Sequence, residues 1–288
     1  MLIRSFEYMS PRSIEEACSF LNEHHEQARV LAGGQSLIPL MKLNLVDVKY
    51  VVDLKRIPGL VGITQSDGLV KVGALTTHSE VADSQIVRSA LPLLSDTASK
   101  IGHPQVRNRG TIGGSLSHAD PAADYIPTLL VLEGWLNTVS PGGARRRIPA
   151  GEFFKGAFST ALGRGEILEE IEVPIPPREV SHSFLKLTLG HGDFPLLVVS
   201  ALGNMKNGSF EEVRIGLGGA SEVAFRSREA EEYLKGKAAT QENIREASRL
   251  AAQRARPEGD LGVSKEYKAR MLGVYLRRAL EAISGSGE

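Results

Sequence analysis

Residues 110–124 read Gly-Thr-Ile-Gly-Gly-Ser-Leu-Ser-His-Ala-Asp-Pro-Ala-Ala-Asp, the most informative stretch of the chain. It sets two adjacent glycines, Gly113 and Gly114, among hydroxyl residues. Adjacent glycines lack Cβ atoms and tolerate positive φ, so their backbone N–H groups can converge on an anion. We therefore expect residues 110–117 to form a loop that binds a phosphate group, and an ordinary turn is the alternative.

A second glycine pair lies near the N-terminus, in Leu-Ala-Gly-Gly-Gln-Ser-Leu at residues 31–37. We expect a short helix from Ser36, whose N-terminus favours a phosphate group. The hydroxyl of Ser36 or of Thr111 adds a further donor. A diphosphate needs many donors, and two such loops would supply them from both sides. Neither loop has the spacing of a Rossmann or P-loop motif.

Two carboxylates follow the second glycine pair. Asp120 precedes Pro121, which is typical of an N-cap residue with proline at the first helical position. Asp124 lies one turn further on, where its oxygens suit hydroxyl and N–H groups of a ligand. The alternative for Asp120 is ligand contact, and the alternative for Asp124 is a solvated charge at a helix start.

Composition narrows the class of protein. The chain has 288 residues, 34 basic and 34 acidic, so its net charge is zero. This balance gives no support for nucleic acid as a partner. No apolar run approaches the roughly 20 residues of a membrane span, and no signal peptide is visible at the N-terminus. These patterns predict a cytoplasmic location.

Cys18 is the only cysteine, and it lies on the apolar face of an expected helix. One thiol forms no internal disulfide and supplies no iron–sulfur cluster or structural zinc site. The seven histidines show no metal-binding spacing. We therefore expect no metal in this chain.

The periodicity of apolar residues predicts an α+β chain. The first expected helix begins at Ser13. The other expected helices span residues 36–42, 81–100, 121–132, 227–234, 240–255 and 265–283. The expected strands span residues 29–32, 50–54, 69–74, 181–188, 196–205 and 212–218, with a hairpin turn at Asn207-Gly208 between the last two. Residues 102–120 are expected to form a loop rich in Gly, Asn and Pro. The stiff Pro-Ile-Pro-Pro run at 174–177 divides the chain into two expected domains, residues 1–176 and 177–288.

Two longer stretches carry a family resemblance. Ala-Gly-Gly-Gln-Ser-Leu-Ile-Pro-Leu-Met-Lys at 32–42 and Thr-Ile-Gly-Gly-Ser-Leu-Ser-His-Ala-Asp-Pro-Ala-Ala-Asp at 111–124 resemble the FAD-binding, or medium, subunit of molybdenum hydroxylases. Gly-Ala-Leu-Thr-Thr at 73–77, Pro-Gln-Val-Arg-Asn-Arg-Gly at 104–110 and Gly-Asp-Phe at 192–194 also fit this family, in the same order. This family includes carbon monoxide dehydrogenase medium chains and xanthine dehydrogenase FAD-binding subunits.

The resemblance implies a fold and a site. The N-terminal domain, of the molybdopterin dehydrogenase type, would hold an extended, non-covalent FAD between two α/β subdomains. The C-terminal domain would be a small sheet with helices packed on it. When the family's cofactor contacts are transferred position by position, the residues that would contact FAD are Ala32, Gly33, Gly34, Gln35, Ser36, Leu37, Ile101, Gly102, Thr111, Gly113, Gly114, Ser115, Asp120, Asp124, Ile167 or Leu168, Lys186 and Phe194. For Phe194 the alternative is a core position in a strand.

The resemblance also implies a function. The chain would take electrons from a small [2Fe-2S] subunit, while a large subunit would carry the molybdenum cofactor and oxidise the substrate. The flavin would pass these electrons to an external acceptor, and a dimer of heterotrimers is expected.

Two alternatives stay open at this point. A self-sufficient FAD-dependent oxidase or monooxygenase would need an acid or base over the flavin, and His191 is the candidate. A subunit that keeps the fold but has lost its flavin is the other alternative, and the intact glycine pairs argue against it.

Overall fold

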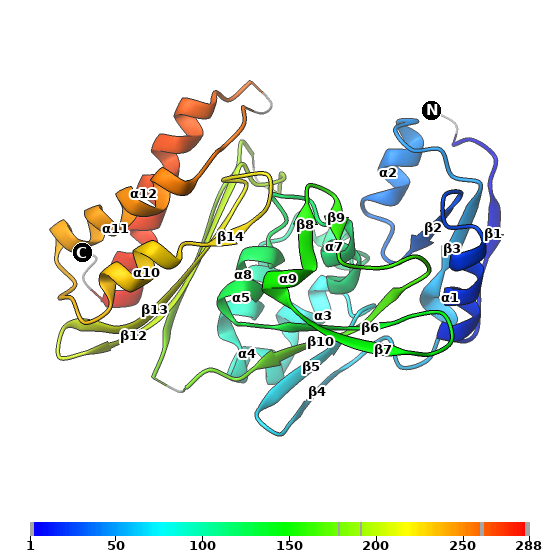
Figure 1. Ribbon diagram of the computed structural model, residues 1–288, viewed down its shortest axis with the longest axis horizontal. Helices are drawn as coiled ribbons and strands as arrows, with labels where there is room; N and C mark the ends of the chain where they lie inside the picture. Colours follow the sequence, from blue (N-terminus) through cyan, green and yellow to red (C-terminus); the bar gives the residue numbers. More distant parts are fainter. Residues whose placement is uncertain (1–2, 178, 191, 260–261, 286–288) are drawn as a thin grey trace.

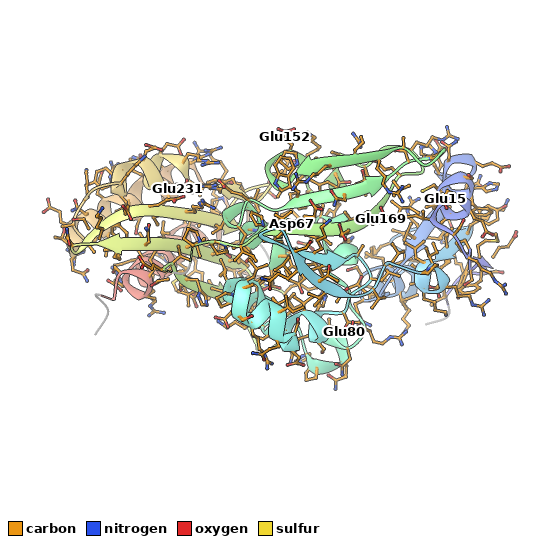
Figure 2. The ribbon with its side chains drawn as sticks, turned by 90° about the horizontal axis from the view of Figure 1, so that it is seen from below. Glu15, Asp67, Glu80, Glu152, Glu169 and Glu231 are labelled. Atoms are coloured by element: carbon orange, nitrogen blue, oxygen red, sulfur yellow. The ribbon has the colours of Figure 1, made fainter. Side chains whose placement is uncertain are left out.

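The molecule is elongated, with an N-terminal unit at one end and a layer of C-terminal helices at the other (Figure 1). A computed structural model describes residues 3–177, 179–190, 192–259 and 262–285. Figure 2 shows the same order from below, with Glu15 near one end of the molecule and Glu231 towards the other. The chain is α+β, as the sequence predicted.

The N-terminal unit is a small parallel sheet with the order β1-β3-β2. Its strands are β1 (Glu7–Met9), β2 (Ala28–Leu31) and β3 (Tyr50–Asp53), and its helices are α1 (Ile14–Glu23), α2 (Leu37–Lys42) and the 3-10 turn η1 (Leu54–Arg56). Ser13 caps α1 by accepting a hydrogen bond from Glu16 N, as the sequence predicted. The parallel strands bring the end of β2, and hence the first glycine pair, to one edge of this sheet.

The central unit is a five-stranded antiparallel sheet with helices packed against its apolar face. Its strands, in sheet order, are β4 (Ile63–Ser66), β5 (Leu69–Gly73), β10 (Ile167–Pro174), β6 (Trp135–Val139) and β7 (Arg145–Pro149). A short helix α9 (Ala150–Phe153) and the two-stranded ribbon β8 (Phe154–Gly156) and β9 (Ser159–Thr160) follow β7.

One expected helix is in fact three. The stretch 81–100 was expected to be continuous, but it holds the end of α3 (His78–Asp83), then α4 (Gln85–Ala90) and α5 (Pro92–Ser99). Ser84 has an extended backbone and caps α4 by accepting from Val87 N. Pro92 then starts α5, because proline lacks the N–H that a continuing helix needs.

The prediction of a loop from 102 to 120 is also wrong, because this stretch contains α6 (Pro104–Arg107) and α7 (Ile112–His118). The second glycine pair therefore lies inside the first turn of a helix. The next helix, α8 (Tyr125–Val131), begins four residues later than predicted. Asp120 is not its N-cap, because its carboxylate instead accepts a hydrogen bond from Ala122 N at 2.9 Å in the preceding turn.

The C-terminal unit is an antiparallel sheet covered by helices on its outer face (Figure 1). Its strands are β11 (Ser181–Leu187), β12 (Leu197–Lys206), β13 (Ser209–Gly218) and β14 (Phe225–Arg226), and its helices are α10 (Arg228–Leu234), α11 (Gln241–Arg254) and α12 (Lys265–Ser284). The predicted hairpin turn is present, with φ of 51° at Asn207 and 75° at Gly208.

Helix α8 joins the central and C-terminal units. All seven of its residues are buried, and it packs against β12 and β13. A Cβ atom on Gly216 would clash with the backbone of Pro127, so this glycine lets β13 approach the helix closely. Arg226 of β14 donates to Glu133, just after α8, at 2.7 Å. The two units therefore share a continuous core.

Candidate functional site

The two glycine segments lie side by side. A Cβ atom on Gly33 would overlap the backbone of Arg109 and Gly110, and one on Gly114 would lie 3.3 Å from Ala32 Cβ. The segment after β2 is thus pressed against the segment that leads into α7. The absence of side chains at these glycines makes this approach possible.

The first segment presents a row of backbone donors. Among the residues that the structure describes, no protein acceptor is found for the five N–H groups from Gly33 to Leu37. The next N–H, of Ile38, donates to Gly34 O at 3.2 Å. Gly34 has a φ of 71°, a left-handed conformation that turns the chain within this row. Such a row is suited to a phosphate group.

In the second glycine segment, unlike the first, the backbone N–H groups are bonded to other protein groups. The N–H groups of Ile112 and Gly113 donate to Thr76 O at 3.0 Å and to Ala74 O at 2.9 Å. That of Gly114 donates to the hydroxyl of Thr111, the N-cap of α7, at 3.1 Å. These three donors are already engaged within the chain. The polar groups left for a ligand are therefore mainly the hydroxyls of Thr111 and Ser115.

The reason for the glycines in α7 also differs from the expectation. Neither Gly113 nor Gly114 has a positive φ, so of the four paired glycines only Gly34 uses that freedom. Gly113 is needed because a Cβ atom there would lie 2.5 Å from the Cβ atom of Ala74. The glycine lets α7 pack on the end of β5.

Asp124 and Lys186 form a partly enclosed ion pair between α8 and β11. Lys186 Nζ donates to Asp124 Oδ1 at 3.2 Å, and Asp124 is 7% exposed. Asp124 is therefore not the solvated charge that the alternative proposed. Burial raises the pKa of Asp124 to about 6, although the attraction of Lys186 acts in the opposite direction. The pair brings together two predicted cofactor contacts that lie 62 positions apart in sequence.

Three other predicted positions lie outside the two glycine segments in sequence. Ile101 and Gly102 are half-buried, and their carbonyl oxygens accept hydrogen bonds from Arg107. Phe194 is 62% exposed after β11, so it is not a core residue of a strand. The loop that carries Phe194 reaches the central unit, because a Cβ atom on Gly192 would overlap the ring of His103.

Two predicted positions contribute little accessible surface. Ile167 and Leu168 lie in β10 with exposures of 3% and 4%, and their side chains belong to the hydrophobic cores. A side-chain contact between either residue and a ligand would be small. Asp120 is half-buried and its Oδ1 atom is engaged by Ala122 N.

Sequence reasoning missed the role of the segment 76–78. Thr77 pairs with Thr111 in an antiparallel bridge, and His78 N donates to Gly110 O at 2.9 Å. This segment thus forms the support on which α7 begins. The signal was present in the Thr-Thr pair of the 73–77 run, which the sequence offered only as a family match.

The described residues contain no group of three His, Cys, Asp or Glu side chains that would hold a metal ion. Cys18 is fully buried, and burial raises the pKa of its thiol to about 11. None of the described helices is both long and apolar enough to cross a membrane. His191, the candidate acid or base of the alternative function, lies outside the described residues.

This geometry is typical of a protein that binds a dinucleotide cofactor. A row of amide donors, the hydroxyls of Thr111 and Ser115 and the largely buried Asp124–Lys186 pair come from three successive units. They fit an extended cofactor with a diphosphate and hydrogen-bonding ends. The exposed aromatic ring of Phe194 would suit the flat π-system of a flavin.

Comparison with known proteins identifies the family. Residues 4–176 match the FAD binding domain in molybdopterin dehydrogenase, and residues 182–283 match the CO dehydrogenase flavoprotein C-terminal domain. The chain is 35% identical over 282 residues to the carbon monoxide dehydrogenase medium chain of Hydrogenophaga pseudoflava, covering 98% of each. It is 34% identical to the 6-hydroxypseudooxynicotine dehydrogenase complex subunit alpha of Paenarthrobacter nicotinovorans, covering 96% of this chain and 93% of that one.

The solved structures agree with this result. Carbon monoxide dehydrogenase from Hydrogenophaga pseudoflava, in a form that lacks the Mo-pyranopterin moiety of its molybdenum cofactor, has a chain that superimposes with a TM-score of 0.96. That chain is 36% identical in sequence, and the match covers 100% of both chains. The present chain belongs to the family of FAD-binding medium subunits of molybdenum hydroxylases. It is an oxidoreductase subunit, and FAD is its cofactor.

Proposed function

We propose that this chain is an electron-transfer subunit that takes electrons from the iron–sulfur clusters of a partner subunit and passes them to an external acceptor. The row of N–H groups from Gly33 to Leu37, for which the described part of the chain offers no acceptor, is the observation that carries the proposal, because these groups suit the diphosphate of FAD. The relatives are named as medium chains or complex subunits, which supports a role inside a larger assembly.

We further propose individual roles for the residues around the cofactor. The amides of Gly33 to Leu37 and the hydroxyls of Thr111 and Ser115 bind the diphosphate. Asp124 and Lys186 bind polar groups nearer the flavin, and Phe194 covers part of the ring. The bound flavin supplies the redox chemistry, since it accepts electrons singly and donates them in pairs. The protein holds the cofactor in place and excludes water.

The partners are proposed from the same relationship. A large subunit would carry the molybdenum cofactor, and a small subunit would carry [2Fe-2S] clusters. A dimer of heterotrimers is the expected assembly, since most soluble oligomers are closed by two-fold symmetry. Light scattering of the co-expressed and purified complex measures this stoichiometry. Fractionation of cells tests the expected cytoplasmic location.

The central experiment compares the isolated chain with the complex. Both are loaded with FAD and mixed with substrate without oxygen, while the flavin absorbance is followed. We expect bleaching in the complex, none in the isolated chain and none when the iron–sulfur subunit is left out. Rapid bleaching of the isolated chain by an organic substrate would instead support a self-sufficient flavoenzyme.

A further inference from the structure

His78 and Tyr125 form a buried pair that adjoins two parts of the proposed cofactor site. His78 Nδ1 and the Tyr125 hydroxyl share a hydrogen bond of 3.2 Å, and the ring centroids are 5.4 Å apart. His78 is 4% exposed and Tyr125 is fully buried. Neither residue is among the predicted cofactor contacts, so the pair has no role yet in the proposed function.

His78 supports the turn that begins α7. Its backbone N–H donates to Gly110 O at 2.9 Å, and its ring lies against the same residue. A Cβ atom on Gly110 would be only 2.7 Å from His78 Nε2, so the imidazole and the glycine are in close contact. Thr111, whose hydroxyl caps α7, is the next residue. A displacement of the imidazole would therefore displace this cap.

Tyr125 is linked in the same way to the other part of the site. It is the first residue of α8 and directly follows Asp124. A fully buried phenol ring has little freedom, so its position restricts the backbone of Asp124. The hydrogen bond from Tyr125 to His78 therefore connects Asp124 with the Gly110–Thr111 turn.

The pair is electrically neutral under ordinary conditions. Burial lowers the pKa of His78 to about 4, and the nearby charge of Arg107 lowers it further. Burial raises the pKa of Tyr125 well above its usual value. Two neutral buried groups satisfy each other, and removing one would leave the other without a partner inside the core.

We infer that His78 and Tyr125 are a positioning pair that holds the Gly110–Thr111 turn and Asp124 in the arrangement that FAD requires. This inference rests on the proposed FAD site. Both side chains are buried and act through their neighbours, as supporting residues orient direct ligands elsewhere.

The test is Tyr125→Phe, which removes one hydroxyl and keeps the ring. The FAD dissociation constant of the deflavinated chain is measured by flavin fluorescence, and the 31P resonances of the bound diphosphate are recorded. We expect the dissociation constant to rise about tenfold and the 31P shifts to change. Ser248→Ala is the control, because it removes another buried hydroxyl, which donates to Ile244 O within α11 of the C-terminal helix layer. We expect Ser248→Ala to leave both measurements unchanged.

A second pair of variants tests the imidazole. His78→Asn can keep a polar atom near the position of Nδ1 and should retain most of the FAD affinity, while His78→Leu should lose it like Tyr125→Phe. Equal affinity in wild type and Tyr125→Phe overturns this inference alone. An equal loss in Ser248→Ala and Tyr125→Phe also overturns it, because the effect would then be one of general stability. Failure of the wild-type chain to bind FAD overturns the proposed function as well.

Discussion

At the scale of single residues, the four paired glycines have two different tasks. Gly34 supplies a positive φ, whereas Gly33, Gly113 and Gly114 allow close packing. Gly113→Val would therefore report on the packing of α7 against Ala74 as well as on phosphate binding. A substitution at Gly34 is a cleaner test of the donor row, because its Cβ atom would meet only the side chains of Leu31 and Ile38.

We expect Gly34→Ala to weaken FAD binding by at least tenfold, because alanine disfavours the φ of 71° that orients the amides. Gly68→Ala is the matched control. Gly68 has a φ of 74° and open space around it, so the strain of roughly 1–2 kcal/mol is the same but far from the site. Isothermal titration with FAD and thermal unfolding separate the two effects. Equal FAD affinity in both variants would contradict the assignment of the donor row.

Two buried groups of the site give opposite contributions to the pH dependence of stability. Asp124 has a folded pKa of about 6, above its ordinary 3.8, so the native state holds the extra proton between these values. The contribution of Asp124 to the free energy of unfolding is present at low pH and is lost as the pH rises through 6. His78 has a folded pKa of about 4, below 6.5, so its contribution is lost as the pH falls towards 4. Each amounts to about 3 kcal/mol, and the two nearly cancel.

Asp124→Asn should make the free energy of unfolding of the deflavinated chain depend more strongly on pH. With the Asp124 proton gone, the His78 contribution is left, and the free energy of unfolding should rise by about 1 kcal/mol per pH unit between pH 4 and 6. The wild-type chain should show a flatter profile over the same range. Urea unfolding at several pH values measures both slopes, and parallel profiles would contradict the raised pKa of Asp124.

At the scale of elements, local signals in the sequence predicted several features that the structure confirms. Ser13 caps α1 and Asn207-Gly208 forms a hairpin turn, because each is decided by its own few residues. The division of residues 81–100 was missed, although Pro92 was a visible signal for a helix start. The apolar pattern continues across the breaks, since all three helices pack on the same core.

The helical state of Gly113 and Gly114 was not predictable from local signals. Glycine has a poor helix propensity, and here the contact with Ala74 outweighs it. The proximity of the two glycine segments followed from the resemblance. The Asp124–Lys186 ion pair did not follow from the sequence, because it joins distant residues that meet only when α8 packs on the C-terminal sheet.

The cap of α7 provides a prediction at this scale. Thr111→Ala should lower the free energy of unfolding by about 1 kcal/mol, as expected for a lost N-cap, and should also weaken FAD binding. Thr240→Ala is the control, because Thr240 caps α11 in the same way but within the C-terminal helix layer. Both variants should have similar melting temperatures, and only Thr111→Ala should bind FAD more weakly. An unchanged FAD affinity in Thr111→Ala would remove this hydroxyl from the site.

At the scale of the whole molecule, the division proposed at residue 176 does not coincide with a division of the core. Phe184, Val198 and Leu202 of the C-terminal sheet belong to the same hydrophobic cluster as α5 and α8. The hydroxyls of Thr128 and Ser200 bond across this boundary at 2.8 Å. A chain that ends at residue 176 would expose the fully buried α8 to water.

We therefore expect residues 1–176 to aggregate when they are expressed alone, although they contain both glycine segments and match a family domain by themselves. Exposed apolar surface of this kind promotes association, and Asp124 would also lose Lys186. Co-expression with residues 177–288 should restore a soluble, FAD-binding complex of the two fragments. The uncut chain should unfold in one calorimetric transition, because its units share a core. A soluble 1–176 fragment that binds FAD with the affinity of the full chain would show that the C-terminal sheet is dispensable for the site.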